Sequence, residues 1–448
     1  MGTQIAQQEL HEEICNNESK DISAVYDQIL IILNDDLIEH VPPKTTNDAL
    51  CDQWLHSLAS DGDLFLKPGH GDQVALKNRL IEKLTKAGFY QSKKQFYAFV
   101  FDGIEQKPNI VGRFKFIDLF AGIGGTRLGA QRNSGQCVFS SEFDSFAQDS
   151  YKLNYGETPF GDITTIDAAS IPAHDLLLAG FPCQPFSYSG RCEGFEDKTR
   201  GTLFFDVLRI LEEKQPKVVI LENVKGFKSH DDGQTMHIAL KALQEIGYHT
   251  KWQILNSYDF GVPQYRERWY CIATKENVNF DFPSSQGRDS SLRDIVDLEN
   301  TDPALAINEF ELSRIDYHFQ NNQKQTRVQH DSSKYAPTTK KGRHGVYSFS
   351  KPDGSLRFHV GDVAKTQIQE AFYACLDTYS PTIIANRVPK LWDIKRKLSV
   401  EESLKLQGFP PSFKFNVSNG QAYKQLGNAV TVTVVENIVK QLLEQGVL

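Results

Sequence analysis

Long apolar runs and a secretory leader are both missing from this 448-residue sequence. No apolar stretch approaches the ~20 residues that a helix needs to cross a bilayer. The start of the chain, from Met1 to Ile5, runs directly into polar and acidic residues instead of a charged and then apolar signal. We therefore expect a soluble, non-secreted protein that acts in the cytoplasm without membrane contact.

Paired cysteines are missing too. Seven cysteines occur without CxxC spacing, at positions 15, 51, 137, 183, 192, 271 and 375. Such an odd and scattered set argues against both a disulfide framework and a zinc cluster. We expect a reducing compartment and no bound metal.

Positive charge is scarce overall, since the net charge is −8. It is concentrated in residues 311–400, which hold 15 Lys and Arg against 8 Asp and Glu, so that the rest of the chain carries −15. A basic block on an acidic body predicts a cationic face for a polyanion. A solvated, loop-rich surface is the alternative explanation.

Residues 1–112 form an acidic leader with two helix-period patterns, Val25 to Val41 and Asp72 to Phe89, which predict a small helical extension. From Phe114 onward, apolar strand patterns alternate with helical ones. The predicted strands are Phe116 to Phe120, Val138 to Glu142, Leu176 to Ala179, Val218 to Leu221, and two around Trp252 and Tyr270. This alternation predicts an α/β fold whose mostly parallel sheet has helices on both faces.

The alternation stops in residues 291–395, which are rich in Ser, Asn, Lys, Gly and Pro. Only short strand-like pieces occur there, at Val346 to Ser350 and Arg357 to Val360. We expect a small irregular domain between a catalytic domain at 113–290 and a helical return to it at 396–448.

A glycine-rich turn follows the first predicted strand, in the segment from Phe116 to Gly129. Glu142 ends the next strand about 20 residues later, where an acid can bind ribose hydroxyls, and Asp162 follows the third βα step. The pattern is GxGG, and Asp118 precedes it inside the apolar strand. A carboxylate there would repel a pyrophosphate, which favours S-adenosylmethionine over NAD.

Four reactive side chains are predicted at the same edge of the sheet. Cys183 follows the strand Leu176 to Ala179 between two prolines, Glu222 ends the strand Val218 to Leu221, and Arg266 and Arg268 precede the strand at Tyr270. By itself a cysteine is usually structural, an acid at a strand end is usually solvated, and so is an arginine beside a strand. Together they suit methylation of cytosine.

Carbon 5 of cytosine is a poor nucleophile, so the Cys183 thiolate would first add to carbon 6. Glu222 would protonate ring nitrogen 3, and Arg268, with Arg266, would stabilise the activated ring. Carbon 5 then takes the methyl group, a base removes its proton, and Cys183 is eliminated. These atoms are stacked inside a duplex, so the base must be flipped out.

In combination and order, the motifs between residues 114 and 444 resemble those of bacterial restriction-modification DNA (cytosine-5)-methyltransferases. They are the Asp118 to Gly125 loop, Glu142, Gly161 to Ile163, Pro182 to Ser187, Arg200 to Leu203, Glu222 to Val224, Gln264 to Arg268, Arg396 to Glu402, Leu406 to Pro410, and Gln425 to Val430. The resemblance implies a Rossmann-like S-adenosylmethionine-dependent domain.

The resemblance also implies roles for single residues. The cofactor pocket would be lined by Phe120, Gly122, Ile123, Gly124, Gly125, Glu142, Phe143, Asp162, Ile163, Pro182, Leu203 and Asn428. Cys183, Glu222, Arg266 and Arg268 would be catalytic, and Gln184, Ser187, Asn223 and Thr382 would contact the substrate. The last helix would pack beside the first strand.

The resemblance further implies a monomer that binds double-stranded DNA, recognises its target through residues 291–395, and protects host DNA from a cognate restriction endonuclease with which it forms no stable complex. The stretch Ala385 to Trp392 resembles enzymes that methylate GGNCC or GGWCC sites. For residues 1–110, a DNA-contacting arm, a regulatory segment and a solubilising cap remain open.

Three other functions are alternatives to DNA methylation. A tRNA cytosine-5 methyltransferase shares the chemistry, but such proteins usually have Pro-Pro-Cys where this chain has Phe181-Pro182-Cys183, and lack so large a recognition domain. A catalytically inactive DNA-binding relative would need damage to the nucleophile, the acid or the arginine, and none is visible. An oxidoreductase would need a proton relay beside the glycine turn.

Overall fold

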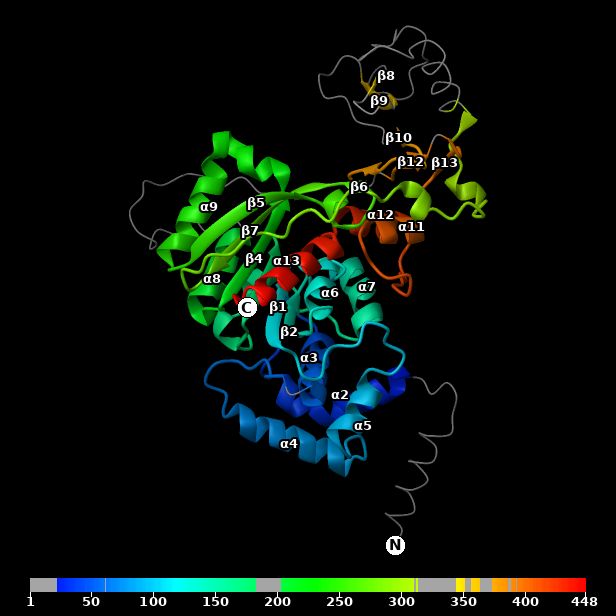
Figure 1. The fold of residues 1–448 in the computed structure, drawn as a ribbon. Coiled ribbons are helices and arrows are strands. Elements are labelled where there is room, and N and C mark those ends of the chain that lie inside the picture. Colours follow the sequence, from blue (N-terminus) through cyan, green and yellow to red (C-terminus); the bar gives the residue numbers. More distant parts are fainter. Residues whose placement is uncertain are drawn as a thin grey trace.

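The computed structural model describes residues 22–60, 62–182, 203–309, 312, 344–350, 356–362, 373–385, 388–391 and 393–448. Three predicted site residues, Cys183, Gln184 and Ser187, lie outside this set, as does most of the basic block at 311–400. In Figure 1 the helical extension lies on one side of the central sheet, and the small strands between residues 344 and 397 lie at the far end.

Where the structure describes the extension, at residues 22–60 and 62–112, it contains four helices: α2 (Ile22–Leu37), α3 (Asn47–Ser60), α4 (Gln73–Lys86) and α5 (Lys93–Val100). α2 and α4 confirm the two predicted helices, and the Asp72 side chain caps α4 by accepting from the Val74 amide at 2.9 Å. α3 was not predicted. It is buried on all sides, including Asp52, Gln53 and His56, so its sequence has no single apolar stripe.

A six-stranded sheet with the order β2-β1-β3-β4-β7-β5 forms the centre of the molecule. Its strands are β1 (Phe114–Leu119), β2 (Gly135–Ser141), β3 (Leu176–Gly180), β4 (Val218–Val224), β5 (His249–Asn256) and β7 (Glu267–Thr274). β1 to β4 run parallel, whereas β7 is antiparallel to both β4 and β5. The predicted mostly parallel sheet is confirmed.

Helices cover both faces of the sheet, as Figure 1 shows. They are α6 (Gly125–Gln131), α7 (Ser145–Tyr155), α8 (Leu203–Lys214), α9 (Gln234–Glu245) and α13 (Val432–Glu444). Two further helices, α11 (Val400–Leu406) and α12 (Asn419–Asn428), share a core with α6 and α7. Alternate residues of β1 point to opposite faces. Phe116 joins a core with Ile438 of α13, while Ile117 joins a core that also includes Trp54 of the extension. The extension therefore shares a hydrophobic core with the sheet.

The region of residues 344–397 adds short strands at the end of the molecule that carries α11 and α12 (Figure 1). They are β8 (His344–Ser350), β9 (Leu356–Asp362), β10 (Tyr373–Ala374), β11 (Ser380–Pro381), β12 (Lys390–Leu391) and β13 (Arg396–Lys397). A further short strand, β6 (Gln264–Tyr265), precedes them in the chain. β8 and β9 pair antiparallel and contain the two predicted strand pieces. β11 pairs in parallel with β6, which joins the region to the catalytic domain.

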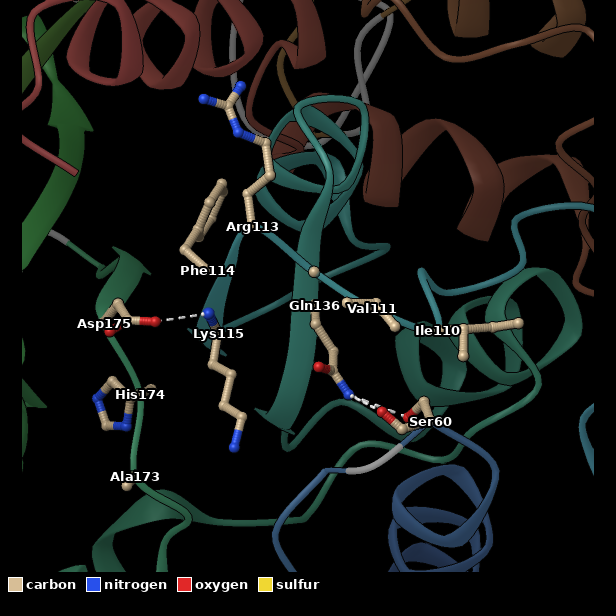
Figure 2. Close-up of a pocket in the computed structure, with 11 residues that line it drawn as sticks. Ser60, Ile110, Val111, Arg113, Phe114, Lys115, Gln136, Ala173, His174 and Asp175 are labelled. Atoms are coloured by element: carbon tan, nitrogen blue, oxygen red, sulfur yellow. Dashed lines mark hydrogen bonds between the residues drawn. The ribbon is translucent and has the colours of Figure 1, made fainter. Parts of the chain in front are cut away.

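A hollow of about 560 Å³ lies where the extension meets the sheet (Figure 2). Gln136 donates to the Ser60 carbonyl there at 2.7 Å, and the Lys115 amide donates to Asp175 at 2.8 Å. Because Lys115 and Gln136 lie near the starts of β1 and β2, this hollow is at the opposite edge from the carboxyl ends of the strands. It contains none of the predicted site residues. No helix in the described ranges has the length and apolarity to cross a membrane.

Candidate active site

The glycine-rich loop between β1 and α6 is held by the carboxylate of Glu142. One carboxylate oxygen accepts from the Gly122 amide and the other from the Asp144 amide, both at 2.8 Å. Phe120, Gly122 and Gly124 all have positive φ, so the loop turns tightly and exposes its backbone. Glu142 is buried, and burial raises its pKa. Each of its oxygens keeps a lone pair for a further donor, such as a ribose hydroxyl.

Close packing fixes the other side of this loop. A Cβ at Gly124 would lie 2.5 Å from the Tyr155 ring, and one at Gly125 would lie 2.4 Å from the Val430 carbonyl oxygen. Ile123 is buried in a core with Leu426 and Val432 from the C-terminal return. The last helix, α13, packs against α6 and shares a hydrophobic core with Phe116 of β1. It therefore lies beside the first strand, as predicted.

The remaining predicted cofactor residues lie after β2 and β3, at the short helix η1 (Ile163–Thr165), and at the ends of α8 and α12. Phe143, beside Glu142, is 75% exposed, as suits a side chain that stacks on a ligand. Asp162 caps η1, and Ile163 is buried. Leu203 begins α8, half-buried, and Asn428 ends α12 with its side chain exposed.

Asp118 does not have the role that the sequence suggested. It is fully buried, accepts a hydrogen bond from the Thr126 hydroxyl at 2.7 Å, and its pKa is raised to about 7 by burial. Because burial disfavours the charged carboxylate, Asp118 cannot repel a pyrophosphate as an exposed anion would. The interpretation of Asp118 as an anion that excludes a pyrophosphate was therefore wrong, although the predicted cofactor does not depend on it.

Glu222 and Asn223 bring the ends of β3 and β4 together. Gly180 pairs with Glu222 in the parallel register, and a Cβ at Gly180 would lie 3.4 Å from the Glu222 carboxylate. Asn223 is buried and donates to the Phe181 carbonyl at 3.0 Å. This bond holds the backbone two residues before Cys183, so Asn223 positions the chain and does not face solvent. Pro182 follows and is exposed.

Two arginines lie near the Glu222 carboxylate but differ in their contacts. Arg268 Nε is 3.3 Å from Glu222 Oε1, and its side chain is partly exposed. Arg266 is buried and donates to the carbonyls of Ile383, Gly427 and Ala429, at 2.7, 3.2 and 2.8 Å. Burial raises the pKa of Glu222, although both arginines act in the opposite direction. Burial and the charge of Arg268 lower the pKa of Arg266 to about 9.

Thr382 and Ile383 are connected to this arrangement by hydrogen bonds with Tyr265 and Gln264. Thr382 donates to the Tyr265 carbonyl at 2.8 Å. Gln264 accepts from the Ile383 amide at 3.0 Å and donates to the Leu406 carbonyl at 2.8 Å. The contacts of Gln264 could not be predicted from the sequence, because its partners are more than a hundred residues away along the chain.

Among the cysteines that the structure describes, Cys51, Cys137 and Cys271 are buried, and burial raises the pKa of each thiol. None of these three is suited to act as a nucleophile. In the described part of the chain, no group of three or more His, Cys, Asp and Glu is placed to hold a metal ion.

Comparison with known proteins decides the family. The model of the C-5 cytosine-specific DNA methylases matches residues 114–444. The chain belongs to this family. The methylase is thus a DNA (cytosine-5)-methyltransferase, and its family uses S-adenosylmethionine. The buried Glu142 carboxylate and the exposed Phe143 beside the glycine loop fit a ligand with a ribose and an aromatic base.

Two curated relatives show how much of the methylase is shared. The Type II methyltransferase M.HhaI of Haemophilus parahaemolyticus is 38% identical over 75% of this chain and 96% of its own length. M.NgoBI of Neisseria gonorrhoeae is 40% identical over 72% of this chain and 91% of its own. The crystal structure of S. pombe Dnmt2 methyltransferase has the same fold, with a TM-score of 0.52 at 20% identity over 74% of this chain and 99% of that one.

Proposed function

We propose that this methylase modifies specific sites in duplex DNA by attack of Cys183 on a flipped-out cytosine. The observation that carries the proposal is the place of the buried Glu222 carboxylate, which lies 3.3 Å from Arg268. Glu222 pairs with Gly180, the last residue of β3, and Pro182 and Cys183 follow Gly180 closely in the chain. An acid with a raised pKa at that place can retain a proton for ring nitrogen 3.

The methyl group that S-adenosylmethionine supplies is transferred to carbon 5. The Cys183 thiolate adds to carbon 6, and Glu222 gives its proton to ring nitrogen 3, which leaves carbon 5 electron-rich. Arg268 stabilises the charge on Glu222 and on the ring. After methylation, a base takes the proton from carbon 5, the ring double bond re-forms as Cys183 leaves as the thiolate, and ring nitrogen 3 returns its proton to Glu222. Arg266, Asn223 and Thr382 hold the surrounding backbone for this chemistry.

The cofactor half of the site has its own residues. Glu142 would accept from the ribose hydroxyls, Phe143 would stack on adenine, and Asp162 would bind the same adenosine part. Phe120, Gly122, Ile123, Gly124, Gly125, Ile163, Pro182, Leu203 and Asn428 would complete the pocket. The Glu142 hydrogen bonds to the Gly122 and Asp144 amides would keep its carboxylate in place before the cofactor arrives.

The wider role follows from the relatives, which are Type II methyltransferases. We infer that this methylase also protects its bacterial host's DNA from a restriction endonuclease, working as a cytoplasmic monomer. Residues 291–395 would recognise the target, with Gln184 and Ser187 beside the cytosine. GGNCC and GGWCC remain the predicted targets.

The test is transfer of labelled methyl groups to duplex DNA and to tRNA, followed by bisulfite sequencing of the DNA. Wild-type protein should label duplex DNA at one short sequence. Cys183→Ser should abolish labelling while DNA binding persists, and the matched variant Cys375→Ser should retain it. Labelling of tRNA alone would favour the RNA-modifying alternative, and turnover by Cys183→Ser would exclude the proposed nucleophile.

A further inference from the structure

The turn at residues 42–46, between α2 and α3, contacts the cofactor edge of the catalytic domain. The Thr165 hydroxyl donates to the Pro43 carbonyl at 2.7 Å, and the Gly161 amide donates to the Thr45 hydroxyl at 3.2 Å. A Cβ at Gly161 would lie 1.9 Å from the Lys44 carbonyl oxygen, so only glycine fits there. The turn of the extension thus lies directly on the Gly161-Asp162 backbone.

Lys44 extends this contact to the Asp162 side chain. Lys44 Nζ donates to Asp162 Oδ2 at 2.7 Å, while the Thr164 amide and hydroxyl donate to Oδ1 at 3.1 and 2.7 Å. The two carboxylate oxygens therefore have separate donors, which fixes the carboxylate plane. Each oxygen still has a lone pair for another donor. These contacts lower the pKa of Asp162, against the effect of its partial burial.

The position of Asp162 relates this contact to the cofactor. Ser141 and Phe160 form a parallel bridge, and the Glu142 amide donates to the Phe160 carbonyl at 2.8 Å. Two residues beyond the bridge are Phe143 on one segment and Asp162 on the other. The acid that Lys44 holds therefore lies on the segment beside the aromatic ring proposed for adenine.

The backbone of Lys44 gives an independent reason to assign its side chain a role. Its φ is +57°, in the left-handed region, which glycine adopts freely and other residues adopt with strain. The Lys44 side chain is 65% exposed, and an ion pair so exposed adds little to the stability of a fold. Strain without a compensating gain in stability is typical of a functional position.

We propose that Lys44 is a positioning residue of the cofactor site, through which the N-terminal extension fixes the Asp162 carboxylate toward the adenosine part of the methyl donor. This inference rests on the proposed function, in which Asp162 binds that part of S-adenosylmethionine. It gives the extension a role in cofactor affinity, distinct from DNA contact or solubility.

Lys44→Gly separates this role from stability. Glycine removes the ammonium group and relieves the positive φ, so thermal unfolding should occur at the wild-type temperature or higher. The dissociation constant for S-adenosylmethionine, measured by titration calorimetry, should nevertheless rise about threefold to tenfold. The KM for DNA and kcat at saturating cofactor should stay the same, and Lys44→Arg should restore most of the affinity.

Gln215→Gly is the matched control, because Gln215 also has positive φ, at +51°, but lies between α8 and β4. It should leave cofactor affinity unchanged. Unchanged affinity in Lys44→Gly would overturn the inference, and tighter binding would show that Lys44 competes with the cofactor. If wild-type protein methylated no DNA, the proposed function would fail first and this inference with it.

Discussion

Two buried glutamates at the carboxyl edge of the sheet occupy comparable places in different surroundings. Glu142 follows β2, and its carboxylate accepts hydrogen bonds from backbone amides, including those of Gly122 and Asp144. Glu222 lies near the end of β4, and its carboxylate faces the guanidinium groups of Arg268 and Arg266. Burial raises the pKa of both.

The two glutamates have the same residue type and similar positions in the fold, so their neighbouring groups determine their different roles. Uncharged donors around Glu142 leave an acceptor suited to neutral hydroxyls, which is the chemistry of binding a ribose. The arginines beside Glu222 stabilise its anion once a proton has left, which is the chemistry of an acid catalyst.

The largest effect is expected for Glu222→Gln, which keeps the shape but cannot give up a proton. We expect kcat to fall by about 10²- to 10⁴-fold, with little change in the dissociation constant of S-adenosylmethionine. Since burial raises the pKa of Glu222, the step that needs its proton should weaken, and wild-type activity decline, as pH rises through that pKa. The variant should lose this alkaline decline.

Glu267→Gln is the control for this experiment. Glu267 lies on the strand that carries Arg268, but its carboxylate pairs with Lys225 at 2.7 Å. Its removal should leave kcat and the pH profile unchanged. A Glu222→Gln enzyme with wild-type kcat, or one that only lost cofactor affinity, would remove the distinction between the two glutamates.

An intermediate effect is expected for Arg266→Met, measured on stability. Three backbone carbonyls would lose their donor, which should lower the free energy of unfolding by about 2–3 kcal/mol. Arg288→Met, which removes a more exposed ion pair with Asp259, should cost less than about 1 kcal/mol in denaturant titration. Wild-type stability with lost activity would instead assign Arg266 to the substrate.

The smallest effect is expected for Glu142→Gln. A neutral amide can no longer accept at both oxygens, so the dissociation constant of S-adenosylmethionine should rise about 10- to 100-fold, as for loss of a charged acceptor. At saturating cofactor, kcat should change little. The exposed Glu436→Gln variant, which loses a surface pair with Arg132, should bind as wild type does. A fall in kcat without weaker binding would contradict the assignment of Glu142.

Much of the fold was predictable because the strands are continuous apolar runs and the helices between them have apolar stripes. α3 was not, since buried polar side chains such as Gln53 and His56 interrupt its pattern. Gln53 donates to the Val138 carbonyl, and His56 Nδ1 lies 2.6 Å from Glu157. These partners lie in the catalytic domain, and a pattern within one helix carries no information about them.

The places of the candidate acids at the strand ends were predictable from the sequence, whereas their contacts were not. The positions of Glu142 and Glu222 follow from the strand ends, where parallel sheets place functional groups. The difference between Arg266 and Arg268 does not, because Arg266 contacts carbonyls contributed by residues 383, 427 and 429. The burial of Asp118 was missed for the related reason that its surroundings come from helix packing.

The most direct test of the central claim is mass spectrometry of the protein after reaction with S-adenosylmethionine and duplex DNA carrying 5-fluorocytosine at the target. After methylation carbon 5 would bear fluorine in place of hydrogen, so no proton could leave and the thiol could not be eliminated. If Cys183 attacks carbon 6, a stable adduct should form on the peptide that contains Cys183. The same adduct should be absent from the Cys183→Ser variant. An adduct on another residue, or none in an enzyme that methylates ordinary DNA, would contradict this role of Cys183.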